Sequence, residues 1–296
     1  CAAPGPARHS GRCRHSGREG FRACPISAGK RAFIQAQSMN DVKALVDGQW
    51  HWNGLLNPKG RLIALFALLR IRADLLYLLL PDFPAEKLSD HLQRFVFRSK
   101  VKLLFNTDKM FAAQFNQASE SPVPRDFILA GAQNTIALDF SSDTLKRRLW
   151  ILPAPLSTGV LSNAGVEANW RDADLQHGLP RLSAAQTELW TPQMLSLERL
   201  NAFSLKKGCY PGQEIVARTH YLGQAKRQTK LVQAGHLSLE APIYRNDEKV
   251  GELICINSEH NMGLALLQSI DDSDLLISCQ NEVKQSQVLT GLQRPV

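Results

Sequence analysis

The stretch from Lys206 to Arg218, KKGCYPGQEIVAR, constrains this chain more than any other, because it places one cysteine between two glycines directly ahead of a helical pattern. Gly208 and Gly212 allow backbone conformations that are closed to other residues, and they let a ligand or another backbone segment approach closely. The residues from Gln213 to Tyr221 have the spacing of a short helix. The stretch therefore predicts a tight loop that leads into a helix.

Cys209 is the reactive residue of this loop. It would lie near the N-terminus of the predicted helix and beside Lys207, and both features favour a thiolate. On the helix, Glu214 and Arg218 are one turn apart and able to form an ion pair. A tight loop whose cysteine merely fills space accounts for the same residues, so the stretch alone leaves both interpretations open.

Length and charge limit the classes of protein that fit. A chain of 296 residues with 44% hydrophobic and 21% charged residues is typical of a globular protein of two or three compact units. The longest apolar run, Leu62 to Leu69, is too short to span a bilayer. The net charge of +8 is concentrated in residues 1–31, whose seven Arg and Lys stand against a single Glu. The nearly neutral remainder disfavours direct binding of nucleic acid.

Residues 1–29 differ from the rest of the chain. They are rich in Arg, Gly, Ala, Pro and Ser, they show no apolar period, and they lack the apolar core of a secretory signal. An Arg- and Ser-rich, acid-poor leader also fits a mitochondrial transit peptide, but no amphipathic helix is visible. We interpret these residues as a disordered or non-native extension in preference to a functional arm. Three cysteines remain outside it, Cys209, Cys255 and Cys279, with no CxxC pair, and the eight histidines include no HExxH motif. This pattern predicts no disulfide framework and no metal site, and it favours the reducing cytoplasm.

The rest of the chain has two different sequence patterns, one before and one after Arg227. Strand-like residues 50–56 and 62–71 flank the turn Asn57-Pro58-Lys59-Gly60, which predicts a hairpin, and helical patterns lie among further strands. After Arg227, short strand-like runs alternate with polar turns, as in a small β-barrel or sandwich. We therefore expect an α+β body over 30–225, possibly in two subdomains, and a β-barrel over 226–296.

The signature KGCYPGQEIVAR, followed by THYLGQAKRQ, resembles that of the YgfZ-type folate-binding proteins. These are relatives of the glycine-cleavage T-protein, an aminomethyltransferase, and are linked to iron–sulfur cluster assembly. The segments FIQAQSMNDV and LNPKGR, and residues 165–180, resemble other parts of the same family. The likeness covers about residues 30–296. It implies a T-protein-like folate-binding body with a C-terminal antiparallel β-barrel.

The resemblance also implies roles for particular residues. Cys209 becomes a functional thiol, in a signature loop with Lys207, Gly208, Tyr210, Gly212, Gln213, Glu214 and Arg218. Trp170 matches a family position that contacts folate, although it also reads as a helix residue half-buried at a domain seam. Phe21 would be a second aromatic of the folate site, although it falls in the extension. The implied cofactor is tetrahydrofolate or a derivative.

One departure from the T-protein pattern bears on catalysis. In T-proteins a Gly-Gly-x-x-Asp motif follows the first hairpin turn, and its Asp is thought to handle a proton at the folate amine. Ala64 stands at that position here, and a methyl group can neither accept a proton nor hold a charge. The resemblance thus implies a cytoplasmic, folate-binding accessory protein for assembly or repair of iron–sulfur clusters. Its partners would be client enzymes, including tRNA-modifying ones, or assembly proteins. A folate-dependent aminomethyl transferase and a tRNA-binding module remain alternatives.

Overall fold

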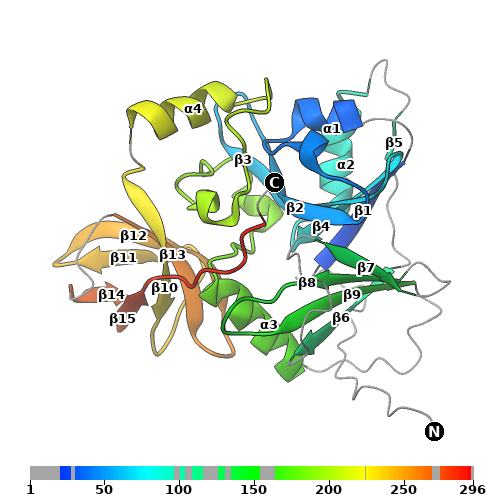
Figure 1. Cartoon of the computed structure of the whole chain (residues 1–296). Coiled ribbons are helices and arrows are strands. Elements are labelled where there is room, and N and C mark those ends of the chain that lie inside the picture. The colour runs from blue at the N-terminus through cyan, green and yellow to red at the C-terminus, as the bar shows by residue number, and fades with distance from the viewer. Residues whose placement is uncertain are drawn as a thin grey trace, which may run out of the picture.

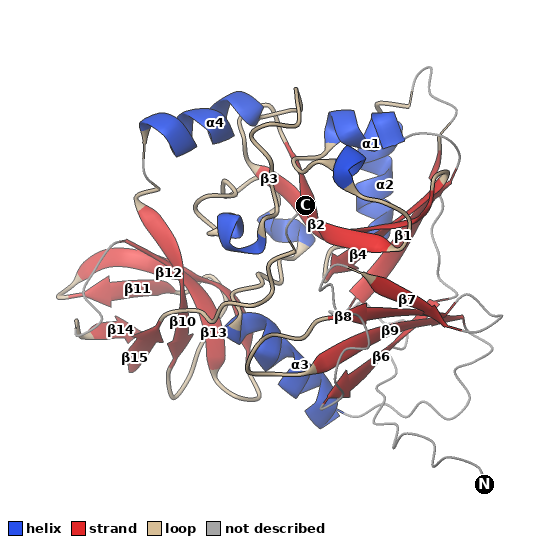
Figure 2. Cartoon of the chain, in the orientation of Figure 1, coloured by secondary structure: helices blue, strands red, loops and turns tan. Residues whose placement is uncertain are grey.

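The structure is a computed structural model of the chain. It describes residues 21–27, 31–96, 101–103, 109–115, 126–130, 135–153, 164–223, 225–268 and 274–294. Two antiparallel sheets and a closed barrel surround a long connecting segment between the helices α3 and α4 (Figures 1 and 2). The predicted α+β body and C-terminal antiparallel barrel are therefore both present.

The first sheet has five antiparallel strands in the order β2-β3-β4-β1-β5. Their bounds are β1 Phe21–Ser27, β2 Gln49–Leu56, β3 Leu62–Arg72, β4 Leu75–Pro81 and β5 Lys102–Leu103. The predicted hairpin is confirmed, because β2 and β3 pair around the turn at residues 57–60. Trp50 and Trp52 point into the central core, whereas Phe66 and Leu68 join a second cluster. Helices α1 (Arg31–Gln37) and α2 (Ala85–Gln93), with the short η1 (Val42–Ala44), pack on that second cluster.

Part of the segment expected to be a disordered or non-native extension is a strand. Residues Phe21–Ser27 form β1, which pairs antiparallel with β4 along its whole length and with β5 at its end. The backbone of β4 supplies the partners, and this pairing across the fold leaves no local trace in the sequence. Pro25 also argued against predicting a strand here, because proline is depleted from interior strands. Residues 1–20 and 28–30 lie outside the described part of the chain.

The second sheet has four antiparallel strands in the order β6-β9-β8-β7. Their bounds are β6 Lys109–Phe115, β7 Phe127–Ala130, β8 Thr135–Asp139 and β9 Arg147–Pro153. Helix α3 (Ala164–Gln176) contacts β6 of this sheet and β12 and β13 of the barrel (Figure 2). The helix therefore joins the body to the barrel. Two short 3-10 helices, η3 (Ala184–Gln186) and η4 (Leu197–Leu200), follow it.

Helix α4 (Gln213–Leu222) leads into the barrel, whose strands close in the order β10-β13-β12-β11-β14-β15. Their bounds are β10 Arg227–Gln233, β11 Pro242–Arg245, β12 Glu248–Asn257, β13 Met262–Gln268, β14 Leu276–Ser278 and β15 Asn281–Ser286. Closure pairs the first barrel strand with the last. Because β10 begins at Arg227, we propose a boundary between body and barrel near residue 226.

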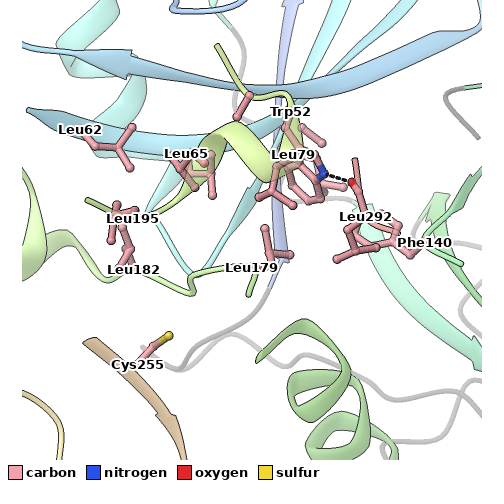
Figure 3. Close-up of a cluster of buried hydrophobic side chains, with 14 of the residues drawn as sticks. Trp52, Leu62, Leu65, Leu79, Phe140, Leu179, Leu182, Leu195, Cys255 and Leu292 are labelled. Carbon is pink, nitrogen blue, oxygen red and sulfur yellow. Dashed lines mark hydrogen bonds between the residues drawn. The ribbon is translucent and has the colours of Figure 1, made fainter. Parts of the chain in front are cut away.

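The segment after β15 returns from the barrel to the centre of the molecule. The Trp52 indole Nε1 donates a 2.9 Å hydrogen bond to the carbonyl of Leu292, and Phe140 lies nearby (Figure 3). The Leu289 amide donates to the carbonyl of Gln176, at the end of α3, and the Arg294 amide donates to that of Leu200 in η4. Segment 288–294 is thus tied to the first sheet, to α3 and to η4.

Within the described ranges, no helix has both the length and the apolar composition needed to cross a membrane.

Candidate functional site

The Cys209 loop, residues 206–212, has the backbone that its glycines predict. Gly208 has φ +95° and Gly212 has φ +79°, both in the left-handed region that favours glycine. Helix α4 starts directly afterwards at Gln213, as predicted. The Cys209 side chain is exposed, whereas its neighbour Tyr210 is buried. The loop therefore presents the thiol to solvent while Tyr210, the next residue, is buried in the protein.

Lys207 fixes one side of this loop to α1. Its Nζ donates hydrogen bonds to the carbonyls of Gln35 and Ser38 and lies 4.9 Å from the centre of the Tyr210 ring. The Gln35 Nε2 donates back to the Lys207 carbonyl at 3.2 Å. Burial lowers the pKa of Lys207 to about 8 and raises that of Tyr210 to about 12. Lys207 thus mainly holds the loop against α1. This role could not be predicted from the sequence.

Gly212 fixes the other side of the loop to the β2–β3 hairpin. A Cβ atom on Gly212 would lie 2.6 Å from the carbonyl oxygen of Asn57 and 2.7 Å from the Cα of Gly60. A Cβ on Gly60 would in turn lie 2.8 Å from the Cβ of Ile215 in α4. Two motifs that are far apart in the sequence, the hairpin turn and the signature, therefore meet backbone to backbone. Only glycine permits this approach.

The remaining signature residues lie on α4 and differ in exposure. Glu214 and Arg218 are exposed on α4, and no ion pair between them is present in the described part of the structure. Gln213 is half-buried at the first turn. The expected pairing of Glu214 with Arg218 is thus not seen. The loop is held instead by Lys207, Tyr210 and Gly212.

Trp170 lies on α3 and is only 5% exposed. The Arg147 guanidinium stands 4.5 Å from its ring centre, and the rings of Phe140 and Phe115 lie 5.5 and 5.7 Å away. A pterin ring would reach Trp170 only after one of these neighbours moved, and Phe115 is the most exposed of the three. Trp170 is therefore enclosed by these three side chains in this conformation.

Cys209 and Ala64 lie apart from Trp170. Cys209 precedes α4, at the top of the view in Figure 1, whereas Trp170 is in α3, between the barrel and the second sheet. Phe21 opens β1, whose side chains lie outside the described part. Ala64 is 3% exposed on β3, and its methyl group joins the apolar cluster under α1 and α2. The structure therefore does not bring Cys209 or Ala64 to Trp170. Phe21 stays a prediction: its strand partner Pro81 precedes Asp82, which pairs with Arg171 next to Trp170.

A buried ion network was not foreseen. Arg181 forms two hydrogen bonds to the Asp82 carboxylate, at 2.7 and 2.8 Å, and a third to Asp174 at 2.7 Å. Arg147 binds the second oxygen of Asp174 at 2.7 Å. Burial alone would lower the pKa of Arg181, but Asp82 and Asp174 outweigh it and raise the pKa. The network links the end of β4, α3 and β9. No local spacing signals it, because Asp82 and Arg147 are far in sequence from Asp174 and Arg181.

The described cysteines differ in setting. Cys255 is buried in the barrel, where burial raises the pKa of its thiol to about 11, whereas Cys209 and Cys279 are exposed. All three are free thiols. Among the described residues, no three His, Cys, Asp or Glu side chains are grouped so that they could hold a metal ion.

Comparison with known proteins gives this arrangement a context. No model of a known protein family matches the chain. It is 27% identical over 280 residues to a protein of Aliivibrio fischeri named tRNA-modifying protein YgfZ, covering 87% of this chain and 86% of that protein. The protein of that name in Colwellia psychrerythraea is 25% identical over 281 residues, covering 87% and 85%. An uncharacterized protein of Haemophilus influenzae is 27% identical over 266 residues, covering 87% and 88%.

A solved structure supports the fold independently. The crystal structure of glycine cleavage system aminomethyltransferase T from Bartonella henselae matches with a TM-score of 0.71, over 97% of this chain and 88% of that one. The identity is 12%, so this likeness concerns the fold alone. The resemblance that the signature indicated is thus confirmed from both sequence and fold. The chain is a relative of the proteins named tRNA-modifying protein YgfZ, built on the fold of the glycine-cleavage aminomethyltransferase.

Proposed function

We propose that this protein is a folate-binding accessory protein that supports the assembly or repair of iron–sulfur clusters in client enzymes, including enzymes that modify tRNA. The observation that carries the proposal is the Cys209 loop, which is fixed on two sides while its thiol is exposed. The name of the curated relatives supports the link to tRNA modification. Free thiols favour the reducing cytoplasm as the compartment.

A fixed, exposed thiol suits brief contact with a partner. Lys207 and Gly212 hold the loop against α1 and the hairpin turn, so Cys209 does not have to be ordered when a partner arrives. The described cysteines form no cluster-binding group of their own. Cys209 would therefore meet the cluster or thiol of a client protein or an assembly protein.

The fold supports folate as the cofactor, and Ala64 argues against a transferase. Tetrahydrofolate would bind near Trp170 once Phe115 moves from its ring. Ala64 offers only a methyl group within an apolar cluster, where proton transfer has no acceptor. We therefore propose binding without aminomethyl transfer. Turnover of an aminomethyl donor by the purified protein would contradict this part.

The role of the thiol is tested by replacing Cys209 with Ser. We expect the Cys209→Ser protein to keep its melting temperature, because the side chain is exposed, while the activity of an iron–sulfur client enzyme falls in cells that carry it. Cys279→Ser is the matched control, since Cys279 is the other exposed cysteine of the described chain. Equal client activity in the two variants would refute the role of Cys209.

Folate binding is tested separately by calorimetric titration of tetrahydrofolate into the full chain. We expect saturable binding with one site, accompanied by a change in tryptophan fluorescence because Trp170 lies at the proposed site. Absence of binding would remove folate from the proposal and leave the Cys209 experiment unaffected.

A further inference from the structure

Helix α4 (Gln213–Leu222) buries little of its surface. Val216 is the only one of its ten residues that is fully buried. A helix of this length is marginal in water by itself, because helices in proteins gain most of their stability from packing an apolar face. At its end stand Tyr221 and Leu222, with exposed fractions of 68% and 83%, the highest of any large hydrophobic residue in the described part of the chain. These two side chains therefore add little to the stability of the chain.

The exposed residues of α4 share one face, which we call the α4 stripe. Successive residues of a helix are about 100° apart, so Arg218, Tyr221 and Leu222 point to the side opposite Val216. Glu214 lies one turn before Arg218 on the same side, and all four side chains of the stripe are exposed. The stripe therefore runs along the outside of α4 from its first turn to its last, at the top of the view in Figure 1.

One partner can cover the α4 stripe and the thiol together. Helix α4 has ten residues and is therefore about 15 Å long. Cys209 lies in the loop that leads directly into its first turn. A standard interface buries about 800 Å² on each partner, which corresponds to a patch roughly 30 Å across. A protein that contacts Cys209 can therefore also contact Tyr221 and Leu222.

The composition of the stripe fits a protein partner. A single exposed leucine needs no explanation, because much of any protein surface is apolar. Here a tyrosine and a leucine are adjacent, and they lie on the helix that follows the exposed thiol. Tyrosine is among the residues that supply most of the binding energy at protein interfaces, and arginine is another. Arg218 is one turn from Leu222, so the stripe combines both with an aliphatic side chain.

The charges of this region indicate the character of the partner. Between residues 206 and 226 the exposed charged side chains are Lys206, Arg218 and Lys226, against Glu214 alone. Complementary charge guides two proteins to the correct orientation. The matching face would therefore be acidic, with an apolar recess for the two hydrophobic side chains.

We propose that the α4 stripe is the docking surface for a protein partner with an acidic contact face, which binds there while its cluster or thiol meets Cys209. The inference rests on the function proposed above, because the partner is the client or assembly protein to which the thiol is presented. It separates two tasks on one surface. Tyr221, Leu222 and Arg218 hold the partner, and Cys209 makes the chemical contact.

The first test measures client-enzyme activity in cells that carry full-length variants. Tyr221→Ala/Leu222→Ala should lower the activity at least threefold and keep the melting temperature, because both side chains are exposed. Leu275→Ala is the matched control, since Leu275 is 57% exposed and lies beside β14 of the barrel. Equal activity of these two variants, in cells where Cys209→Ser lowers it, would overturn the docking surface and leave the role of the thiol standing. No loss with Cys209→Ser would refute the proposed function and this inference with it.

The second test reverses a charge. Arg218→Glu should lower client activity by a similar factor, whereas Lys284→Glu, on an exposed residue of β15, should leave it unchanged. Equal activity of the two variants, or higher activity with Arg218→Glu, would contradict an acidic partner face.

The third test identifies what lies on the stripe. A photo-reactive benzophenone amino acid is placed in the full chain at Lys206 in one protein and at Leu222 in another. We expect both to capture the client or assembly protein in cells, and capture at position 206 to fall at least tenfold when Tyr221 is also replaced by Ala. Adducts with RNA, different proteins at the two positions, or capture at 206 that is unaffected by Tyr221→Ala would overturn the inference.

Discussion

At the scale of single residues, Gly208 and Gly212 of the Cys209 loop have different structural roles. Both have positive φ, but a Cβ on Gly208 would meet no atom within 4 Å, whereas one on Gly212 would meet the backbone of Asn57 and Gly60. Gly208 therefore supplies conformation alone. Gly212 supplies conformation and also the space in which the hairpin turn and α4 come together.

This difference predicts the effect of alanine at each position. Gly212→Ala should lower the free energy of unfolding by roughly 2–4 kcal/mol, because backbone strain adds to a clash with backbone atoms that cannot move away. Gly208→Ala should cost only about 1–2 kcal/mol, the strain alone. Urea denaturation measures both values. Equal losses in the two variants would show that the close approach of Gly212 to Gly60 contributes nothing.

Lys207 predicts a dependence of stability on pH. Burial lowers its pKa to about 8 in the folded protein, from an ordinary value of 10.5, with smaller effects of Asp41 and Lys43. Between these values the unfolded chain binds more protons than the folded one, so stability should rise as the pH rises. The destabilisation is fully present below pH 8 and should shrink, by on the order of 1–2 kcal/mol, as the pH approaches the unfolded value.

The measurement compares the wild type with Lys207→Met by urea denaturation from about pH 8 to 9.5. This range ends below the titration of tyrosine, which matters because Tyr210 has a raised pKa and acts in the opposite direction. The difference in slope between the two proteins isolates Lys207, whatever the variant loses in absolute stability. Parallel slopes would contradict a lowered pKa.

At the scale of elements, β1 is a strand that the sequence pattern did not predict. It lies between β4 and β5, so its removal leaves backbone groups of both neighbours without partners. A chain that starts at Gly20 should keep the melting temperature of the full chain. One that starts at Gly29 lacks β1 and should lose several kcal/mol, as roughly 1 kcal/mol goes with each backbone hydrogen bond. Circular dichroism during heating compares them, and equal melting temperatures would contradict the placement of β1.

Elements with local signals were predictable, and those that depend on distant partners were not. Asn57-Pro58-Lys59-Gly60 marks a turn by its own composition, and Gly212 marks the start of α4 by its own conformation. The network around Arg181 joins residues that meet only in the fold, such as Asp82 and Arg147. The sequence also placed Lys207 beside Cys209 without showing that its ammonium turns toward Gln35 and Ser38.

At the scale of the whole molecule, segment 288–294 ties the parts together. Leu292 is 1% exposed in the central core, whereas Leu289 in the same segment is 42% exposed. Leu292→Ala should therefore lower the free energy of unfolding by about 2–5 kcal/mol, through lost burial and a cavity beside Trp52. Leu289→Ala should cost about 0.5 kcal/mol. Urea denaturation followed by tryptophan fluorescence tests both, and similar small losses would contradict the central position of the segment.

The return of segment 288–294 to Trp52 also has a consequence in time. A ribosome makes every strand and helix that this segment covers before it makes Leu292 and Arg294. While the barrel is being translated, the Trp52 indole N–H and the apolar surface around it stay uncovered, because segment 288–294 has not yet been made. The nascent chain should therefore rely on chaperones until this segment has been made, and a product that stops after β15 should be recognised by proteases as unfinished.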